Sequence, residues 1–277
     1  MARPLRVAIP GGLYHVTSRG NDGQVVYFDD CDRTRFIDLL ASVVERFHLL
    51  CHSYCLMSNH YHLLLETPKA NLSPAMRQLN GPYAQSFNRR HVRCGHLFQA
   101  RFRSILVQKE SHLLRCVSYI VRNPVRARIC EQPGQWRWSS YNAIAGRAPA
   151  ATFLCTDELL RTFAPTRRRA QERYRDFVAG GADDDLLSEV RGERLGDKAF
   201  LRVRYGDDER LREIPQVQLE PLRLPLEEIF ASSSEPVAVA YRDHDYSLRE
   251  ISEHLGCHYS TVSRRLRREE RMLHCKT

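Results

Sequence analysis

The sequence predicts an α+β protein in which a βαββαβ unit with an antiparallel sheet is followed by an all-α C-terminal region. Over the first half of the chain, hydrophobic residues follow the two-residue period of strands or the period of a helix. These segments occur in the order strand, helix, strand, strand, helix, strand, helix. Beyond residue 151 the chain is helix-forming and rich in charge, and two short amphipathic helices lie near its end.

The four predicted strands are residues 13–18, 49–57, 60–66 and 101–108. Each is rich in apolar, aromatic or β-branched residues, and Ser58-Asn59 supplies a tight hairpin between the second and third. Since a hairpin joins antiparallel neighbours, the sheet is expected to be mostly antiparallel.

The three predicted helices each begin at a residue that favours a helix N-terminus. Asp32 caps the first, and Ser73 precedes a proline at the first position of the second, which we expect to kink at Gly81-Pro82. Ser111 caps the third, which ends at Asn123 because a proline follows.

Composition limits the class of protein. The chain has 277 residues, of which 43% are hydrophobic, and no apolar run approaches the roughly 18 residues needed to cross a bilayer. The N-terminus has no signal-peptide pattern, so neither a membrane protein nor a secreted one is expected. The nine cysteines are an odd number without a CxxC pair, which favours a reducing, cytoplasmic location.

The charge of the chain favours a polyanionic partner. Lys and Arg number 42 against 33 Asp and Glu, a net charge of +9. Between Phe87 and Arg128 there are ten basic residues and one acidic residue, Glu110. A stretch of one sign concentrates electrostatic potential, so we expect nucleic acid to bind there.

His60-Tyr61-His62 lies within the third predicted strand. Side chains alternate along a strand, so His60 and His62 share a face, about 6.5–7 Å apart, and can converge on one divalent cation. Two histidines spaced in this way can equally be polar surface residues that bind nothing.

Tyr119 is the candidate nucleophile. On the third predicted helix it lies roughly 160° from the centre of the apolar stripe, on the far side, and shares its face with Arg115, Arg122 and Asn123. A phenol beside two guanidinium groups fits attack on a phosphate, although an exposed tyrosine without a role gives the same pattern. Asn123 can supply a third, oxygen ligand to a cation held by the histidines. Mg²⁺ or Mn²⁺ is then favoured, and imidazole also tolerates Zn²⁺.

Five motifs in order resemble the single-tyrosine HUH transposases, and within them the REP-associated tyrosine transposases. They are YHVTSRGN at 14–21, MSNHYH at 57–62, GHLFQARF at 95–102, YIVRNPVRA at 119–127 and WSSY at 138–141. The resemblance covers residues 8–145 and implies a ferredoxin-like domain that cleaves and rejoins single-stranded DNA, often at hairpins, through a 5′-phosphotyrosine. It implies Tyr119 as nucleophile, His60 and His62 as metal ligands and Asn123 as the third, a position where relatives carry Gln. Predicted DNA contacts in this domain are Arg19, Asn21, Arg101, Arg103, Arg115 and Arg122.

A second DNA-binding signal lies near the C-terminus. Ser247 and Glu250 have the spacing of a capping box, Gly256 ends the helix that follows, and a basic helix begins near Ser260. This order is typical of a helix-turn-helix whose second helix enters the major groove of duplex DNA, and it resembles the helix-turn-helix of bacterial replication initiators. Its predicted contacts are Thr261, Ser263, Arg264, Arg265 and Arg268. A helical tail with a solvated charged face is the alternative.

We therefore divide the chain into a transposase-like catalytic domain at 1–147, a charged helical connecting region at 152–230 and a helix-turn-helix domain at 240–272, with 231–236 as a linker. The expected partners are single-stranded and hairpin DNA for the first domain and duplex DNA for the last. The resemblance leaves open a monomer or a homodimer. Two other functions fit parts of the sequence, namely a DNA-binding regulator that has lost catalysis, and a replication or conjugation initiator.

Overall fold

The structure is a computed structural model, and it describes residues 8–181, 185–191, 193–202, 224–242, 244 and 246–274. The chain divides into two compact units, Met1–Gln218 and Leu219–Thr277, each described here by itself. Parts of the predicted connecting region 152–230 lie outside the described residues. Its described part up to residue 202 packs against the core of the first unit, and the three-part division stays a prediction.

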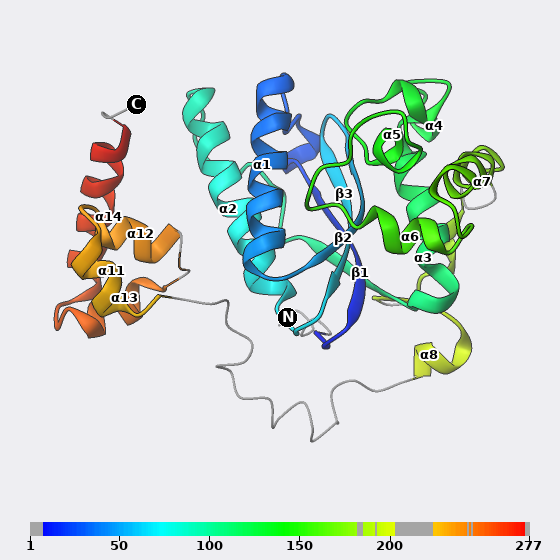
Figure 1. Cartoon of the computed structure of the whole chain (residues 1–277). Coiled ribbons are helices and arrows are strands. Elements are labelled where there is room, and N and C mark those ends of the chain that lie inside the picture. Colours follow the sequence, from blue (N-terminus) through cyan, green and yellow to red (C-terminus); the bar gives the residue numbers. More distant parts are fainter. Residues whose placement is uncertain are drawn as a thin grey trace. The chain divides into compact units, whose positions relative to one another are not determined.

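A five-stranded sheet organises the first unit, in the order β2-β3-β1-β4-β5 (Figure 1). All pairs are antiparallel except β4 and β5. The bounds are β1 Gly12–Arg19, β2 Leu50–Leu56, β3 His60–Thr67, β4 Arg103–Val107 and β5 Arg194–Leu195. The predicted α+β architecture and antiparallel βαββαβ unit are confirmed, and β5 is an addition that the sequence did not predict.

Helices cover both faces of this sheet. Figure 1 shows α1 (Asp30–Arg46) and α2 (Leu72–Arg90) on one face and α3 (Lys109–Val121) on the other. The alternation of β3 explains how each face is filled. Tyr61 contacts Phe36 of α1 at a ring distance of 4.9 Å, whereas His62, the next residue, contacts Tyr119 of α3 at 6.1 Å.

Further helices are described in the first unit. The α-helices are α4 Asn123–Arg126, α5 Tyr141–Ile144, α6 Thr156–Arg161, α7 Arg167–Ala179 and α8 Lys198–Arg202, and the 3-10 helices are Asn21–Gly23, Pro133–Gln135 and Leu186–Glu189. Buried residues of α5, α6 and α7 belong to the same hydrophobic core as the sheet.

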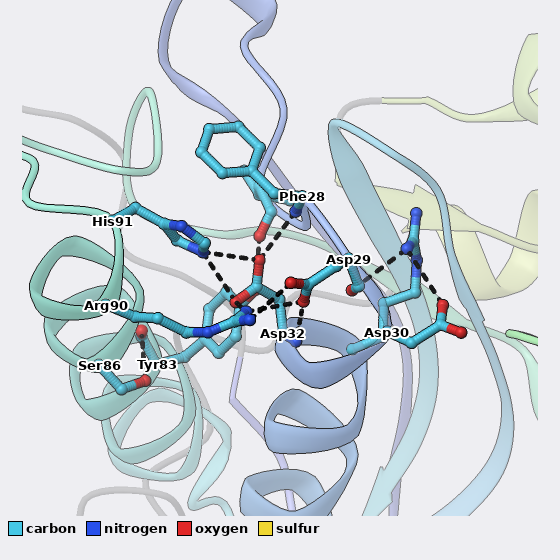
Figure 2. A network of polar contacts seen from close by, with 10 residues as sticks. Phe28, Asp29, Asp30, Asp32, Tyr83, Ser86, Arg90 and His91 are labelled. Atoms are coloured by element: carbon cyan, nitrogen blue, oxygen red, sulfur yellow. Dashed lines mark hydrogen bonds and ion pairs between the residues drawn. The ribbon is translucent and has the colours of Figure 1, made fainter.

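Asp32 does not cap α1 as predicted, because Asp29 is the N-cap and accepts a bond from the backbone nitrogen of Asp32. The buried Asp32 carboxylate instead joins α1 to the end of α2. It accepts hydrogen bonds from the Phe28 backbone nitrogen at 2.8 Å, Arg90 Nη1 at 2.6 Å and His91 Nε2 at 2.9 Å (Figure 2). Arg90 also bonds both carboxylate oxygens of Asp29. These charge-assisted bonds hold α1 and α2 together at this end.

As predicted, α2 runs on through Pro82 to Arg90. The start of the third helix needs correction, because α3 begins at Lys109 rather than after Ser111. The Ser111 hydroxyl bonds Nδ1 of His112 at 2.6 Å instead of capping the backbone. The preceding residue, Gln108, occupies the N-cap position without a side-chain cap.

Glu66, near the end of β3, is the centre of a small ionic cluster. Its Oε2 lies 2.8 Å from His52 Nε2 and 2.8 Å from Lys109 Nζ. Burial raises the pKa of Glu66, but the bonds to His52 and Lys109 outweigh it and hold that pKa below its ordinary value of 4.5. The cluster ties β2 and β3 to the start of α3.

Among its described residues, the second unit has four helices with their own hydrophobic core, namely α11 Leu226–Ser232, α12 Pro236–Arg242, α13 Leu248–His254 and α14 Tyr259–His274. The predicted capping box is present, since Ser247 Oγ accepts from the Glu250 backbone nitrogen and Glu250 Oε2 accepts from that of Ser247. Gly256 adopts φ +59° after α13, as expected of a helix-ending glycine. The predicted linker 231–236 is wrong, because it is only the turn between α11 and α12, which share one core.

Candidate active site

The strand register brings three histidines to one face of the sheet. Thr17 of β1 is paired with His62 of β3, and His15 is paired with Leu64. Paired residues share a face of the sheet, and so do residues two apart in one strand, such as His15 and Thr17. His15 therefore lies on the same face as His62, the face covered by α3. His60 and His62 share this face, as predicted, with their ring centroids 5.0 Å apart.

Hydrogen bonds occupy the Nδ1 atom of both predicted ligands. His62 Nδ1 lies 2.8 Å from His15 Nε2, with the two rings nearly coplanar, and His60 Nδ1 lies 2.6 Å from Asn59 Oδ1. His62 Nε2 is buried and has no hydrogen-bond partner among the described residues. A buried polar atom without a partner is costly, so Nε2 of His62 is suited to a ligand from outside the chain.

The three imidazoles are held neutral. Burial lowers the pKa of His15 and of His60 to about 4, with smaller contributions from Arg103 and Arg19. Burial lowers the pKa of His62 well below 6.5, helped by its two neighbouring histidines and by Arg126. Neutral imidazole is the form that coordinates a metal ion.

Tyr119 is buried against these histidines. Its exposed fraction is 4%, and its ring meets those of His15 and His62 edge to face, with centroids at 5.9 and 6.1 Å. The prediction that Tyr119 faces away from the core is therefore wrong, and the structure places its ring beside His62. The helical wheel misled because buried residues lie on several sides of α3, so burial does not follow a single apolar stripe.

A guanidinium group lies over the face of the Tyr119 ring. Arg126 Cζ is 4.4 Å from the ring centroid, an interaction between a cation and an aromatic ring, and the Arg126 side chain is exposed. Sequence reasoning missed both Arg126 and His15 as site residues. Arg126 follows Tyr119 by seven residues, two helical turns, and His15 follows from strand alternation once β1 is paired with β3.

Asn123 begins α4, directly after α3, and its side chain bonds back to the helix. Its Nδ2 donates to the carbonyl oxygen of Tyr119 at 2.9 Å, and the residue is 8% exposed. Because the amide nitrogen is engaged, the oxygen Oδ1 is the atom that remains for a cation.

The donor set fits a divalent metal as far as the described side chains go. His60 and His62 offer Nε2, and Asn123 offers an amide oxygen, which together suit a hard or borderline ion with open positions for phosphate. Among the described residues, no group of three or more His, Cys, Asp or Glu side chains is placed to hold a metal ion. The candidate ligands are two imidazoles and one amide oxygen, so they do not count as a group of this kind.

Two of the predicted arginine contacts lie near the candidate site. Arg19 and Arg103 act electrostatically on His60 and His15, as the unpredicted Arg126 does on His62.

Two others have partners within the protein. Arg115 forms an ion pair with Glu189, and Arg122 Nη1 donates to the carbonyl of Val178 in α7. These two side chains join the α3 region to the 3-10 helix Leu186–Glu189 and to α7, and a part in DNA binding stays a prediction for both.

Two further predicted contacts are Asn21 and Arg101. Asn21 is in the first 3-10 helix, where its backbone nitrogen donates to the carbonyl of Leu97, and Arg101 is exposed in the segment that leads to β4.

Cys51 and Cys55 of β2 are close to the two histidines in the sequence. Both are fully buried, and burial raises the pKa of both thiols, so we interpret them as packed core residues.

Comparison with known proteins shows which families two segments of the chain are similar to. Residues 11–123 match the family described as "Transposase IS200 like", and residues 238–269 match a helix-turn-helix domain. Over residues 11–123 the chain is similar to the IS200-like transposases. The match spans β1 to Asn123 and so contains all three histidines and Tyr119.

Two relatives extend the comparison to homologues. A Haemophilus influenzae protein assigned by name to the REP-associated tyrosine transposases is 25% identical over 143 residues, which is 48% of this chain and 81% of that protein. A solved structure of a REP-associated tyrosine transposase bound to a REP hairpin is 18% identical, with a TM-score of 0.46, and the match covers 57% of this chain and 93% of the other. Over about half of its length the chain is similar to a REP-associated tyrosine transposase.

The segment that matches a helix-turn-helix domain consists of α12, α13 and α14. Of the predicted contacts, Thr261, Arg264 and Arg268 are exposed on α14, and Ser263 is half-buried. Arg265 differs, because its Nε donates to Glu269 Oε1 at 2.7 Å and its guanidinium lies 5.7 Å from the centre of the Phe230 ring. Glu269 in turn accepts bonds from the first backbone nitrogens of α12, so Arg265 supports the packing of this unit.

Among the described residues, no helix is both long and apolar enough to cross a membrane.

Proposed function

We propose that this protein cleaves and rejoins single-stranded DNA at hairpin-forming ends, as a transposase-type nickase and strand transferase in which Tyr119 is the nucleophile. The single observation that carries the proposal is the burial of Tyr119 against His62, whose Nε2 has no partner among the described residues. Tyr119 lies in the same chain as the histidines, so the proposed chemistry needs no residue from a second copy.

In the proposed reaction, the phenolic oxygen of Tyr119 forms a bond to phosphorus as the bond from phosphorus to the 3′ oxygen breaks. The phenol loses its proton and the departing 3′ oxygen takes one up, which leaves a 3′-hydroxyl and a 5′-phosphotyrosine. No bond energy is lost to hydrolysis, so a 3′-hydroxyl can later reverse the step and rejoin the strand.

The residues of the site divide the work. His60, His62 and Asn123 would hold Mg²⁺ or Mn²⁺, which when bound polarises the scissile phosphate. His15 holds the ring of His62 by its 2.8 Å hydrogen bond, so that Nε2 faces the cation. Arg126, over the ring of Tyr119, supplies positive charge where the phosphate must arrive.

For the DNA substrate, the proposal combines the two units. The site would take the single strand, while Thr261, Arg264 and Arg268 on the exposed face of α14 would contact duplex DNA or a hairpin stem. The solved REP-associated tyrosine transposase described above is bound to a REP hairpin, so a hairpin is the first substrate to test.

A regulator without catalysis is the alternative, and it requires only the helix-turn-helix. It gives no reason for a buried tyrosine beside imidazoles held neutral. The two functions separate in a nicking assay on single-stranded DNA.

The test uses the full chain, Mn²⁺ and hairpin oligonucleotides taken from the DNA that flanks the gene, labelled at the 3′ end. The wild type is expected to give an adduct that survives denaturing electrophoresis, and EDTA to abolish it. Tyr119→Phe is expected to bind the oligonucleotide as well as the wild type and to form no adduct. Adduct formation by Tyr119→Phe would refute the assignment of the nucleophile.

A further inference from the structure

Arg122 stands at the point where the helix that carries the proposed nucleophile gives way to the next one. It is the C-cap residue of α3 and the N-cap residue of α4. Its backbone carbonyl accepts a hydrogen bond from the backbone nitrogen of Arg126 at 2.9 Å, which closes the turn of α4. The backbone conformation at Arg122 therefore determines how α4 is placed against α3.

Three side chains of the candidate active site depend on this junction. Tyr119 precedes it, and Asn123 and Arg126 follow it. Asn123 Nδ2 donates to the carbonyl oxygen of Tyr119 at 2.9 Å, and Arg126 Cζ lies 4.4 Å from the centre of the Tyr119 ring. Because both contacts cross the junction, a shift of its backbone would disturb them together.

The side chain of Arg122 reaches the C-terminal end of α7. Its Nη1 donates to the carbonyl oxygen of Val178 at 3.0 Å. The last carbonyls of a helix lack partners within the helix, and a positive charge is favourable beside them. The helix α7 lies outside residues 11–123, so the partner of Arg122 comes from beyond the segment that is similar to the IS200-like transposases.

A glycine makes room for the guanidinium group of Arg122. Gly181 follows α7 and adopts φ +65°, a conformation that favours glycine. A Cβ at this position would lie 2.8 Å from Nη2 and 3.1 Å from Cζ of Arg122, so the guanidinium would have to move. Gly180 differs, because its φ is −63° and a Cβ there would meet only the carbonyl oxygens of Phe177 and Asp176, at 3.5 and 3.6 Å.

The helix α7 is itself fixed in the core of the first unit. Ala170, Tyr174 and Val178 are spaced four residues apart and are all fully buried. Arg175 Nη1 donates to the carbonyl of Ala145, directly after α5, at 2.8 Å. A helix held in this way can support a side chain that binds its end.

We infer that Arg122 is a positioning residue, which through its bond to the end of α7 fixes the junction of α3 and α4. The junction in turn sets the position of Tyr119 relative to Asn123 and Arg126. The inference rests on the proposed function for the roles of these three residues. It gives Arg122 a role different from the DNA contact that the sequence predicts, and it makes α7 a support of the active site.

Three variants test this role. Arg122→Met keeps an unbranched side chain but removes the charge and the donor to Val178. Gly181→Ala leaves the charge of Arg122 in place and displaces its guanidinium group. Gly180→Ala is the matched control, since it adds the same methyl group one residue earlier, where the structure has room. Urea unfolding establishes that each variant is folded under the conditions of the assay.

The experiment uses the full chain, Mn²⁺ and a hairpin oligonucleotide from the flanking DNA. It measures the single-turnover rate of adduct formation at saturating DNA and, separately, the Kd for DNA at several salt concentrations. Misplacement of a reacting group by about 1 Å can lower a rate about 100-fold, so Arg122→Met and Gly181→Ala are each expected to lower the rate about tenfold or more. Their Kd is expected to stay within about twofold, and Gly180→Ala to keep the wild-type rate.

Hydrogen exchange gives a readout that needs neither DNA nor catalysis. In the metal-free protein, the backbone amides of residues 119–127 are expected to exchange faster in Arg122→Met and Gly181→Ala than in the wild type. Gly180→Ala is expected to exchange as the wild type does.

The outcomes separate this inference from the proposed function. A higher Kd with a shallower salt dependence in Arg122→Met, together with the wild-type rate in Gly181→Ala, would show a phosphate contact and overturn the inference. Wild-type rates and wild-type exchange in both variants would overturn it as well. Faster exchange at 119–127 in both variants, without any adduct in the wild type, would uphold the support of the junction by α7 and refute the proposed nuclease.

Discussion

His15→Phe tests whether the bond between His15 and His62 prepares the candidate metal site. His15 is 3% exposed, and its Nε2 lies 2.8 Å from His62 Nδ1. Phenylalanine keeps an aromatic ring at this position but removes the nitrogen, so Nδ1 of His62 loses its partner in a buried place.

Two magnitudes follow from this geometry. A buried polar group left without a partner costs about 1–3 kcal/mol in the free energy of unfolding. Loss of the group that orients a metal-binding histidine lowers metal affinity about 10- to 100-fold, or about 1.4–2.7 kcal/mol. The His15→Phe protein should therefore stay folded and bind Mn²⁺ more weakly by that factor.

The assay is titration of the DNA-free protein with Mn²⁺, by calorimetry or electron paramagnetic resonance, together with urea unfolding. Ile105→Val is the control, since Ile105 is paired with His15 on β4 and its shortening lowers stability by about 1 kcal/mol while every imidazole nitrogen stays in place. Ile105→Val should bind Mn²⁺ as the wild type does. Wild-type affinity in His15→Phe would show that His15 does not position His62.

Three further predictions concern stability and the second unit. Asp32→Asn should lower the free energy of unfolding, measured in urea, by about 2 kcal/mol, because the charge-assisted bonds of Asp32 join α1 to α2. The control, Asp30→Asn at an exposed position, should change it by less than about 0.5 kcal/mol. Equal effects of the two substitutions would contradict the role of the network. Glu66 has a lowered pKa in the folded protein, so its contribution to the free energy of unfolding is present above about pH 4.5 and is lost as pH falls through the folded pKa. Glu66→Gln should therefore flatten the fall of the free energy of unfolding below pH 4.5. An unchanged pH dependence in this variant would count against the prediction. Arg264→Ala should weaken duplex binding and reduce by about one the slope of log affinity against log salt concentration, whereas Arg265→Ala should chiefly lower the melting temperature. Weaker duplex binding in Arg265→Ala and a lower melting temperature in Arg264→Ala would contradict the roles assigned to these residues of α14.

Local patterns in the sequence were sufficient to predict most of the fold. Four strands and the helices between them follow from hydrophobic periodicity, and Ser247 and Glu250 form the expected capping box. The fifth strand, β5, is only two residues long and has no periodicity to detect. Asp32 was misassigned as a cap because a carboxylate that accepts from another helix looks the same in sequence as one that caps its own.

The candidate site was predicted in part for a related reason. The spacing of His60 and His62 fixes their shared face whatever the tertiary structure, and the structure brings Tyr119 to that face. The burial of Tyr119 depends on which sides of α3 the rest of the fold covers, which periodicity does not report. His15 reaches the site through strand pairing, and Arg126 reaches it at the end of α4.

Peptide mapping of the protein–DNA adduct tests the central claim most directly. Wild-type protein incubated with Mn²⁺ and a flanking hairpin oligonucleotide is digested with nuclease and protease, and the peptide that carries the residual nucleotide is sequenced by mass spectrometry. The account predicts a 5′-phosphate ester on the phenolic oxygen of Tyr119. A nucleotide attached to any other residue, or cleavage of the hairpin with no attached nucleotide, would contradict it.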